Sequence, residues 1–169
     1  MWQSKKTLAA ESVRLDEETG RLFCSGEVKS IIPYRHKGRE EERLEVSAET
    51  MSFEPEENVI SFTQKSSLRL KNIHLRSRSI YIHLKEKNGE MEKIVARGKV
   101  VVVQDEKQGQ GQEGIYEFEE EALTLLGNPV LIDKDKGRIR GDKLTFHMSD
   151  GRIVVENKDR ERSVTVIKS

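Results

Sequence analysis

The chain has 169 residues, which is enough for one domain with a substantial buried core. Its 30 Lys and Arg residues balance its 30 Asp and Glu residues, and this zero net charge argues against a nucleic-acid binder, because such proteins usually carry a basic excess. No apolar run approaches the roughly 18–20 residues of a membrane span. The single cysteine, Cys24, excludes an intramolecular disulfide. We therefore expect a single domain over residues 1–169.

Apolar and charged residues alternate along most of the chain, which is the pattern of a sheet with one buried face. The first example is Leu8–Leu15, where Val13 and Leu15 share one face and Arg14 takes the other. Residues 16–20 (DEETG) then predict a turn with positive φ at the glycine. The chain is therefore expected to open with a strand followed by a hairpin turn.

Residues 33–45 carry a dense run of charges that departs from this alternation. We expect a charged loop or insertion here. Within it, Arg35–Arg43 reads as a solvated hairpin tip or a long loop, with a short surface helix as the alternative.

Further short strands are expected in regular succession. Their predicted bounds are Arg21–Ile32 with a break at Ser25-Gly26, Leu44–Phe53, Val59–Phe62, Ser67–Leu70, Ile73–Leu75, Ile80–Leu84, Ile94–Gln104, Ile115–Phe118, Arg152–Glu156 and Ser163–Lys168. Asn88-Gly89 is the strongest short hairpin signal. Residues 107–114 are rich in Gly and Gln and predict a flexible loop.

The stretch Leu123–Phe146 consists of short alternating runs separated by turns at residues 127–129 and 136–137. Just before it, residues 119–126 fit either strand, turn and strand or a short helix capped by Gly127. The neighbouring strands favour the first interpretation, because so short a helix is unstable alone.

Pairs of apolar residues two positions apart recur along the chain at intervals of roughly 30–40 residues. The pairs are Val13/Leu15, Met51/Phe53, Ile80/Ile82, Tyr116/Phe118 and Leu144/Phe146. Such repetition indicates stacked hairpins, in which each unit buries its apolar face only against its neighbours. Coincidental alternation in an ordinary β-sandwich is the alternative.

The segment Gly109-x-Gly111-x-x-Gly114 matches the spacing of a dinucleotide-binding loop. The residues that follow it have the period of a strand, and a phosphate site of this kind requires the free N–H groups of a helix N-terminus. We therefore expect no bound nucleotide.

Asp133-x-Asp135-x-Gly137 resembles the start of a calcium loop, but the twelfth position, which should be a bidentate carboxylate, is Leu144. The four histidines do not have zinc-site spacing, and no serine lies in a nucleophile elbow. We therefore expect no metal, no cofactor and no enzymatic activity, although a carbohydrate-processing enzyme on a β-helix remains a third hypothesis.

Basic residues flank several apolar positions, as in Arg76-Ser77-Arg78 and Arg138-Ile139-Arg140. They fit a solvated sheet face. The functional alternative is contact with phosphate groups at the rim of an apolar groove, where charge-assisted hydrogen bonds are strong.

Three segments carry a family resemblance: residues 126–129 (LGNP), residues 137–146 (GRIRGDKLTF) and residues 162–167 (RSVTVI). Together they resemble the OstA/LptA-like domain of lipopolysaccharide transport proteins, and residues 16–28 and 96–100 resemble its other repeats. The match is close over roughly residues 94–169 and looser over residues 7–93. The resemblance implies an all-β fold of stacked antiparallel hairpins that form a β-jellyroll open along one side, also called a β-taco.

The resemblance also implies a location and partners. Members of this family are periplasmic, so a signal peptide or membrane anchor would lie outside this sequence. They hold the acyl chains of lipid A in the apolar interior and join LptC-like and LptD-like domains, or further copies of themselves, by pairing of edge strands. In this chain the expected edges are Leu8–Leu15 and Ser163–Lys168.

The sequence thus predicts a periplasmic lipopolysaccharide-binding carrier or bridge protein that shelters lipid A acyl chains during transport from the inner to the outer membrane. The alternative is a structural β-solenoid that assembles end to end without lipid. The expected lipid-binding positions of the interior groove are Leu15, Val28, Phe53, Ile80, Ile82, Val100, Val102, Tyr116, Phe118, Leu125, Ile132, Leu144 and Phe146.

Overall fold

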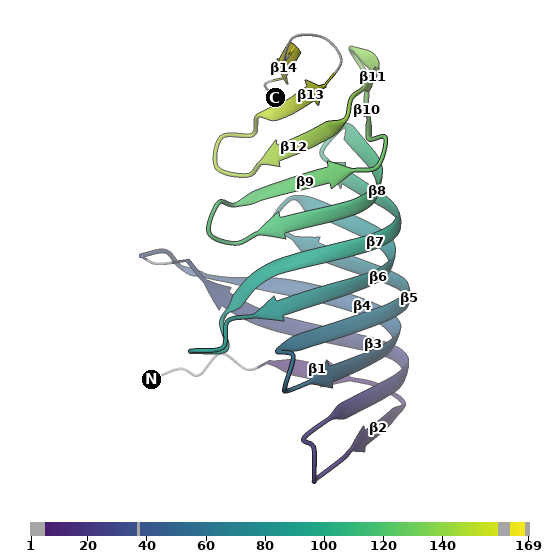
Figure 1. Cartoon of the computed structure of the whole chain (residues 1–169), viewed down its shortest axis with the longest axis vertical. Helices are drawn as coiled ribbons and strands as arrows, with labels where there is room; N and C mark the ends of the chain where they lie inside the picture. The colour runs from purple at the N-terminus through teal and green to yellow at the C-terminus, as the bar shows by residue number, and fades with distance from the viewer. Residues whose placement is uncertain (1–5, 37, 159–162, 168–169) are drawn as a thin grey trace.

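The computed structural model describes residues 6–36, 38–158 and 163–167 and shows an all-β protein (Figure 1). The strands are β1 (Thr7–Ala9), β2 (Ser12–Leu15), β3 (Leu22–Arg35), β4 (Glu41–Glu54), β5 (Val59–Leu70), β6 (Ile73–Leu84), β7 (Met91–Gln104), β8 (Lys107–Glu117), β9 (Ala122–Leu126), β10 (Val130–Asp133), β11 (Gly137–Arg140), β12 (Lys143–His147), β13 (Ile153–Asn157) and β14 (Ser163–Ile167). The described residues include no helix that is long and apolar enough to cross a membrane.

The strands form one antiparallel sheet in the order β1-β3-β4-β5-β6-β7-β8-β9-β12-β13-β14. In addition, β2 pairs with β3, and β10 pairs with both β8 and β11. Most neighbours in the sheet are also neighbours in the chain, so the fold is a stack of hairpins, and its first and last strands lie at opposite ends of the molecule (Figure 1). The predicted architecture of stacked antiparallel hairpins is therefore confirmed.

Polar side chains close several of the hairpin turns. The Asp16 carboxylate accepts hydrogen bonds from the backbone N–H groups of Glu18 and Thr19 at 3.0 and 3.1 Å, and Gly20 has a φ of 71°. Asp133 accepts in the same way from the N–H groups two and three residues ahead, at 2.8 and 3.2 Å. Its carboxylate therefore caps a turn, as the sequence predicted, and this use of Asp is typical of turns.

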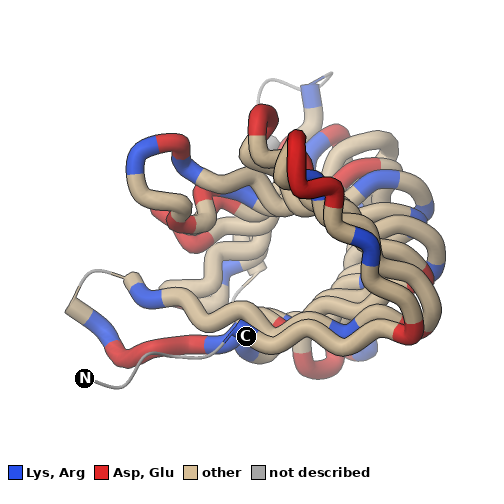
Figure 2. The backbone as a smooth tube through the Cα atoms, turned by 90° about the horizontal axis from the view of Figure 1, so that it is seen from below, with Lys and Arg blue, Asp and Glu red and all other residues tan. Residues whose placement is uncertain are grey.

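Bulges bend the long strands at one corner of the stack. The register shifts after Ser25 in β3, after Thr63 in β5 and after Arg97 in β7, and each shift spans two residues with positive φ. A bulge of this kind kinks a strand and increases its twist. Because the bulges lie at matching positions of alternate strands, the whole sheet turns there. Viewed along the stack, the backbone curls around a common interior and is open on the left, the side on which the β3–β4 hairpin projects in Figure 1 (Figure 2).

The bulges also explain why several strands are longer than predicted. The sequence indicated a break at Ser25-Gly26 and a separate strand start at Ser67, but β3 and β5 run through these points. Gln64 and Lys65 occupy the bulge of β5 with φ of 68° and 51°, a conformation that glycine adopts more easily. Because these residues are polar and lack the alternation, they resemble a loop in the sequence.

The predicted flexible loop at residues 107–114 is wrong, because these residues form most of β8. The reason is tertiary packing. A Cβ at Gly109 would lie 2.7 Å from Leu125 Cδ1 and 2.9 Å from Phe146 Cζ, so glycine leaves the space that these two side chains occupy. Glycine within a strand often marks such a close approach.

Residues 119–126 form a turn followed by β9, in agreement with the interpretation as strand, turn and strand. In the region 33–45, expected as a charged loop or insertion, the described residues 33–36 and 38–45 form the end of the β3–β4 hairpin. Its paired arms reach Arg35 and Glu41, and the ladder continues through Pro33 opposite Arg43. Charged side chains are tolerated there because the ends of the two arms extend beyond the described pairing with the neighbouring strands β1 and β5.

Candidate functional site

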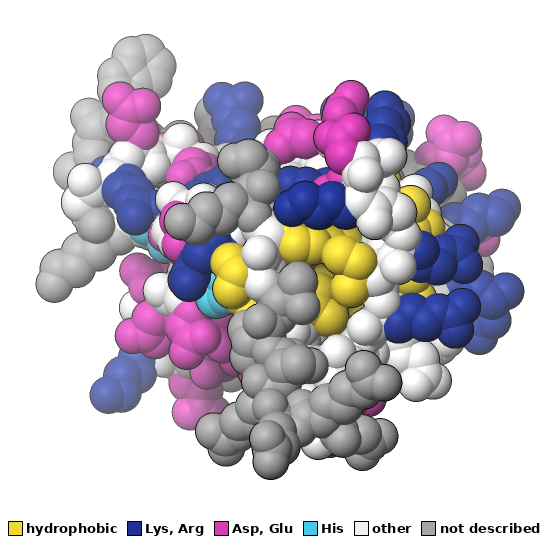
Figure 3. All heavy atoms as spheres, turned by 90° about the horizontal axis from the view of Figure 1, so that it is seen from above, with side chains coloured by type: hydrophobic (Ala, Val, Ile, Leu, Met, Phe, Trp, Pro, Cys, Tyr) yellow, Lys and Arg dark blue, Asp and Glu magenta, His cyan; other side chains and the backbone are white. Residues whose placement is uncertain are grey.

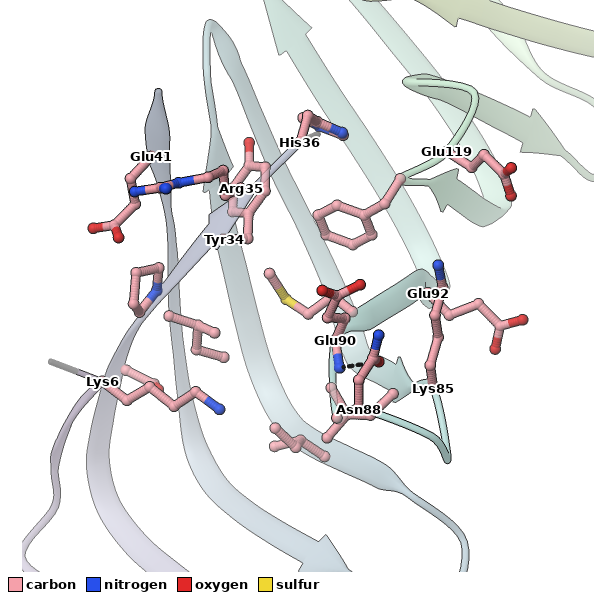
Figure 4. A pocket seen from close by; sticks show the side chains of 18 of the residues that line it. Lys6, Tyr34, Arg35, His36, Glu41, Lys85, Asn88, Glu90, Glu92 and Glu119 are labelled. Carbon is pink, nitrogen blue, oxygen red and sulfur yellow. Dashed lines mark hydrogen bonds between the residues drawn. The ribbon is translucent and has the colours of Figure 1, made fainter. Parts of the chain in front are cut away.

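The open side of the stack contains a groove of about 1030 Å³. One wall is the end of the β3–β4 hairpin. The opposite wall consists of the turn between β6 and β7 (residues 84–92) and the turn between β8 and β9 (residues 118–121). In Figure 4, Tyr34, Arg35 and His36 lie across the pocket from the Lys85–Glu92 turn and from Glu119.

The deeper part of the groove is apolar. Its apolar lining includes Ile32, Met51, Ile60, Leu84, Met91 and Phe118. Cross-strand pairing and alternation explain why several of them share one surface: Leu84 pairs with Met91. Similarly, Ile60 pairs with Phe53, which lies two residues from Met51 on the same face of β4. The groove is therefore a continuation of the hydrophobic core at its open side.

The rim of the groove carries both signs of charge. Its basic residues are Lys6, Arg35, Arg39 and Lys85, and its acidic residues are Glu41, Glu90, Glu92, Glu119 and Glu121. This arrangement of an apolar floor and a charged rim suits a ligand with one apolar and one polar part.

Glu121 is the centre of an ion-pair cluster at this rim and is only 7% exposed. Arg39 Nη1 donates to both of its carboxylate oxygens, at 2.7 and 2.8 Å, and Lys71 Nζ donates to Oε1 at 2.8 Å. His36 Nε2 lies 3.4 Å from the same oxygen. The hydrogen bond from Lys71, and after it the one from Arg39, lowers the pKa of the Glu121 carboxyl, although burial opposes this effect. The carboxylate is therefore ionised at neutral pH.

Aromatic rings lie beside this cluster. The ring of Phe118 is 5.2 Å from that of Tyr34 and 5.0 Å from that of Tyr116, both in edge-to-face geometry. The Tyr34 hydroxyl donates to Glu42 Oε2 at 2.5 Å. Burial raises the pKa of Tyr34 and of Tyr116, so both hydroxyls stay protonated. The rings thus form an apolar contact between the β3–β4 hairpin and β8.

Away from the groove, the interior is filled by side chains. Leu125, Leu131, Leu144, Phe146 and Ile153 are each at most 1% exposed. Seen from the C-terminal end, hydrophobic side chains lie at the centre of the face and Lys and Arg side chains lie around them (Figure 3). The apolar interior therefore extends along the stack, but open space within it is concentrated at the groove.

The structure places most of the predicted groove residues in the interior. Ten are buried: Val28, Ile80, Ile82, Val100, Val102, Tyr116, Phe118, Leu125, Leu144 and Phe146. Phe53 is partly buried and packs against the core. Among all the predicted positions, Phe118 lines the groove, and the others that are buried contact one another instead. Their contact with lipid remains a prediction.

Two predicted interior positions differ from expectation. Leu15 is 60% exposed, because none of the described strands lies beyond β2 at this end of the sheet. It pairs with Leu22, so it shares the inner face and lies at the open mouth of the stack. Ile132 is half-buried, whereas its neighbour Leu131 is fully buried. The inward phase of β10 was therefore assigned one residue too late.

Sequence reasoning missed Ile32, Met51, Ile60, Leu84 and Met91 as groove residues. Alternation identifies which residues point inward, but it does not indicate where the interior is empty. Their shared property, a position near a strand end on the open side, depends on how the sheet curls.

The described residues hold no group of three or more His, Cys, Asp or Glu side chains that would suit a metal ion. Two of the four histidines, His74 and His83, are on β6, and burial lowers the pKa of both. The chemistry that this site supports is binding of an amphiphile.

Comparisons with known proteins agree with this geometry. A family model described as "LptA/(LptD N-terminal domain) LPS transport protein" matches residues 45–152. The structure is similar to that of LptH, the LptA homologous periplasmic component of the lipopolysaccharide transport device from Pseudomonas aeruginosa, with a TM-score of 0.60 and 12% sequence identity over 75% of this chain and 94% of that chain. A search of curated proteins found no match. Because the family model covers more than half of the sequence, this chain belongs to the LptA/LptD N-terminal domain family of lipopolysaccharide transport proteins.

Proposed function

We propose that this chain is a non-enzymatic, periplasmic carrier that shelters the acyl chains of lipid A while lipopolysaccharide moves from the inner to the outer membrane. The observation that carries the proposal is the open-sided groove, which has an apolar floor and a charged rim. Its volume of about 1030 Å³ is at the upper end of the range for ligand pockets, roughly 300–1,000 Å³.

The physical basis is the burial of flexible hydrocarbon. Each methylene removed from water contributes about 0.8 kcal/mol, so an apolar groove holds acyl chains without any catalytic group. The aliphatic and thioether side chains of Ile60, Leu84 and Met91 adapt to flexible chains. Phe118 is the predicted position proposed to contact lipid directly, and the other buried positions are proposed to build the walls behind the groove.

A matched pair of substitutions on β5 tests lipid binding. Ile60 lines the groove, and Ser61 points to the opposite face of the same strand. Purified protein is mixed with fluorescent lipopolysaccharide, and co-elution is measured by gel filtration. We expect Ile60→Glu to reduce capture by about tenfold or more, because a charge in an apolar wall is costly, and Ser61→Glu to retain it. Absence of capture by the wild type, or equal capture by both variants, would contradict the proposal.

We also propose that the ends of the stack pair with LptC-like and LptD-like domains or with further copies of this chain. At the N-terminal end, Val13 and Leu15 are 59% and 60% exposed although they share the inner face. Exposed strand edges of this kind offer rows of unpaired N–H and C=O groups.

Substitutions on β2 test this part of the proposal. Leu15→Asp is expected to reduce end-to-end assembly, measured by light scattering over a range of concentrations, while Arg14→Asp on the opposite face leaves it unchanged. Assembly that is equally affected by both variants would contradict the proposed end contact.

A further inference from the structure

The end of the β3–β4 hairpin is a two-stranded ribbon. In the described residues, β1 pairs with β3 only as far as Ile31, and β5 pairs with β4 only from Leu44 onward. We call the part beyond these points the strap (residues 32–36 and 38–43). Pro33 cannot donate a backbone hydrogen bond, which is typical of an edge segment. An isolated two-stranded ribbon is only marginally stable in water, so its position depends on what holds its end.

Side chains hold the strap against the other wall of the groove. Arg39 makes the two hydrogen bonds to Glu121, 82 residues further along the chain, and Tyr34 packs on Phe118. A third contact joins Glu42 to Lys71 at 3.5 Å. The strap therefore reaches across the open side and is fastened by two ion pairs and a ring contact rather than by a strand ladder.

The two sides of this fastening differ in rigidity. Glu121 is fixed: its backbone has a φ of 50°, its carbonyl accepts a hydrogen bond from Met148 N–H at 2.9 Å, and Lys71 holds its carboxylate. The Arg39 side chain is 52% exposed and belongs to the ribbon. If Arg39 leaves, Glu121 keeps Lys71 as a partner, so release leaves no unpaired buried charge. Such an arrangement suits a contact that opens and closes.

The strap also forms a wall of the groove, since Ile32, Tyr34 and Arg39 line it together with Phe118 and Glu121 on the opposite side. Movement of the strap away from Glu121 therefore widens the groove at its side. Tyr34, His36 and Arg39 precede the span that the family model matches, residues 45–152. The strap side of the fastening therefore lies outside the matched span, whereas Phe118 and Glu121 lie within it.

We propose that the strap is a latch: the Arg39–Glu121 contact narrows the open side of the groove, and its release widens that side so that the acyl part of an amphiphile can enter. This inference rests on the proposed function for the identity of the ligand, although the opening of the strap is measurable without any ligand.

The opening is tested by double electron–electron resonance between spin labels at the exposed positions Glu40 and Glu120, in a Cys24→Ala background. Removal of a charge-assisted hydrogen bond made by a half-exposed side chain shifts a two-state equilibrium by up to about fivefold. We therefore expect Arg39→Ala, and also Glu121→Gln, to add a longer and broader distance population. Arg97→Ala is the matched control, because Arg97 forms an Arg–Glu contact with Glu113 elsewhere on the sheet.

The gating role is tested by the rate at which fluorescent lipopolysaccharide enters the protein. Arg39→Ala is expected to load several-fold faster than the wild type, and joining the cysteines introduced at positions 40 and 120 with a short bismaleimide is expected to slow loading. Circular dichroism checks that each variant is folded.

Unchanged distances in both Arg39→Ala and Glu121→Gln would overturn the latch. A longer distance with unchanged loading, or loading that the bismaleimide does not slow, would overturn its role as a gate. If the wild type captures no lipopolysaccharide, the proposed function fails, and the distance measurement alone then decides whether the strap opens.

Discussion

The groove side and the C-terminal side of this molecule are built from the same alternating strands, yet one is hollow and the other is filled. On the C-terminal side, Phe146 and Leu125 occupy the space in front of Gly109. On the groove side, Met51 and Met91 line open space instead. Repetition of one strand pattern therefore does not determine where a ligand fits. On the filled side, the contact of Leu125 and Phe146 with Gly109 is one packing detail that the strand pattern does not show.

The largest expected difference between the two regions is in stability. Phe146 is fully buried, so Phe146→Ala is expected to cost about 3–5 kcal/mol of unfolding free energy, because a cavity remains. Met91→Ala is expected to cost about 1–2 kcal/mol, because its side chain faces space that is already open. Urea unfolding measures both values. Equal costs would show that the groove is as tightly packed as the C-terminal interior.

A methyl group added on the filled side is the next test. Gly109→Ala would place a Cβ 2.7 Å from Leu125 Cδ1 and 2.9 Å from Phe146 Cζ. We expect a loss of about 1–3 kcal/mol from overpacking. Combining it with Phe146→Leu should cost less than the sum of the two single changes, because the smaller side chain leaves room. Strict additivity in urea unfolding would contradict the proposed contact between these residues.

The pH dependence of the groove rim gives the smallest expected effect. The folded-state pKa of Glu121 lies below its ordinary value of 4.5, mainly because Lys71 donates to it. The stability that this ion pair contributes is therefore fully present above about pH 4.5 and is lost as the pH falls through the folded-state pKa. We expect the ion pairs of Glu121 to contribute about 1 kcal/mol or less to the unfolding free energy, because Arg39 is half exposed and solvent screens its pair with Glu121.

Glu121→Gln should make the unfolding free energy less dependent on pH between about pH 7 and about pH 3.5 than that of the wild type. Glu113→Gln, which removes the exposed partner of Arg97, provides the control. An identical pH profile for Glu121→Gln and the wild type would show that the cluster contributes nothing to stability.

Local patterns in the sequence predicted much of the fold. Asp16 and Gly20 identify their turn because the turn uses local chemistry, and the pair Leu144 and Phe146 identifies an inner face because side chains alternate along a strand. The prediction failed where distant contacts decide. Gly109 resembles part of a loop until Phe146 is placed beside it.

The candidate site was less predictable than the fold for the same reason. Alternation placed Phe118 inside, and this position lines the groove. The Arg39–Glu121 contact joins residues 82 positions apart, and neither residue stands out among its charged neighbours. Leu15 was assigned the correct face, but its exposure depends on the end of the sheet, which periodicity does not reveal.

Photo-crosslinking tests the central claim most directly. A diazirine-bearing residue is placed singly at Met91 in the groove, at Leu144 in the filled interior and at Phe23, which is 45% exposed and pairs with Arg14 on the outer face. After incubation with lipopolysaccharide and illumination, we predict strong labelling at Met91, weak labelling at Leu144 and background labelling at Phe23. Labelling at Leu144 or Phe23 that equals that at Met91, or no labelling at Met91, would contradict the account.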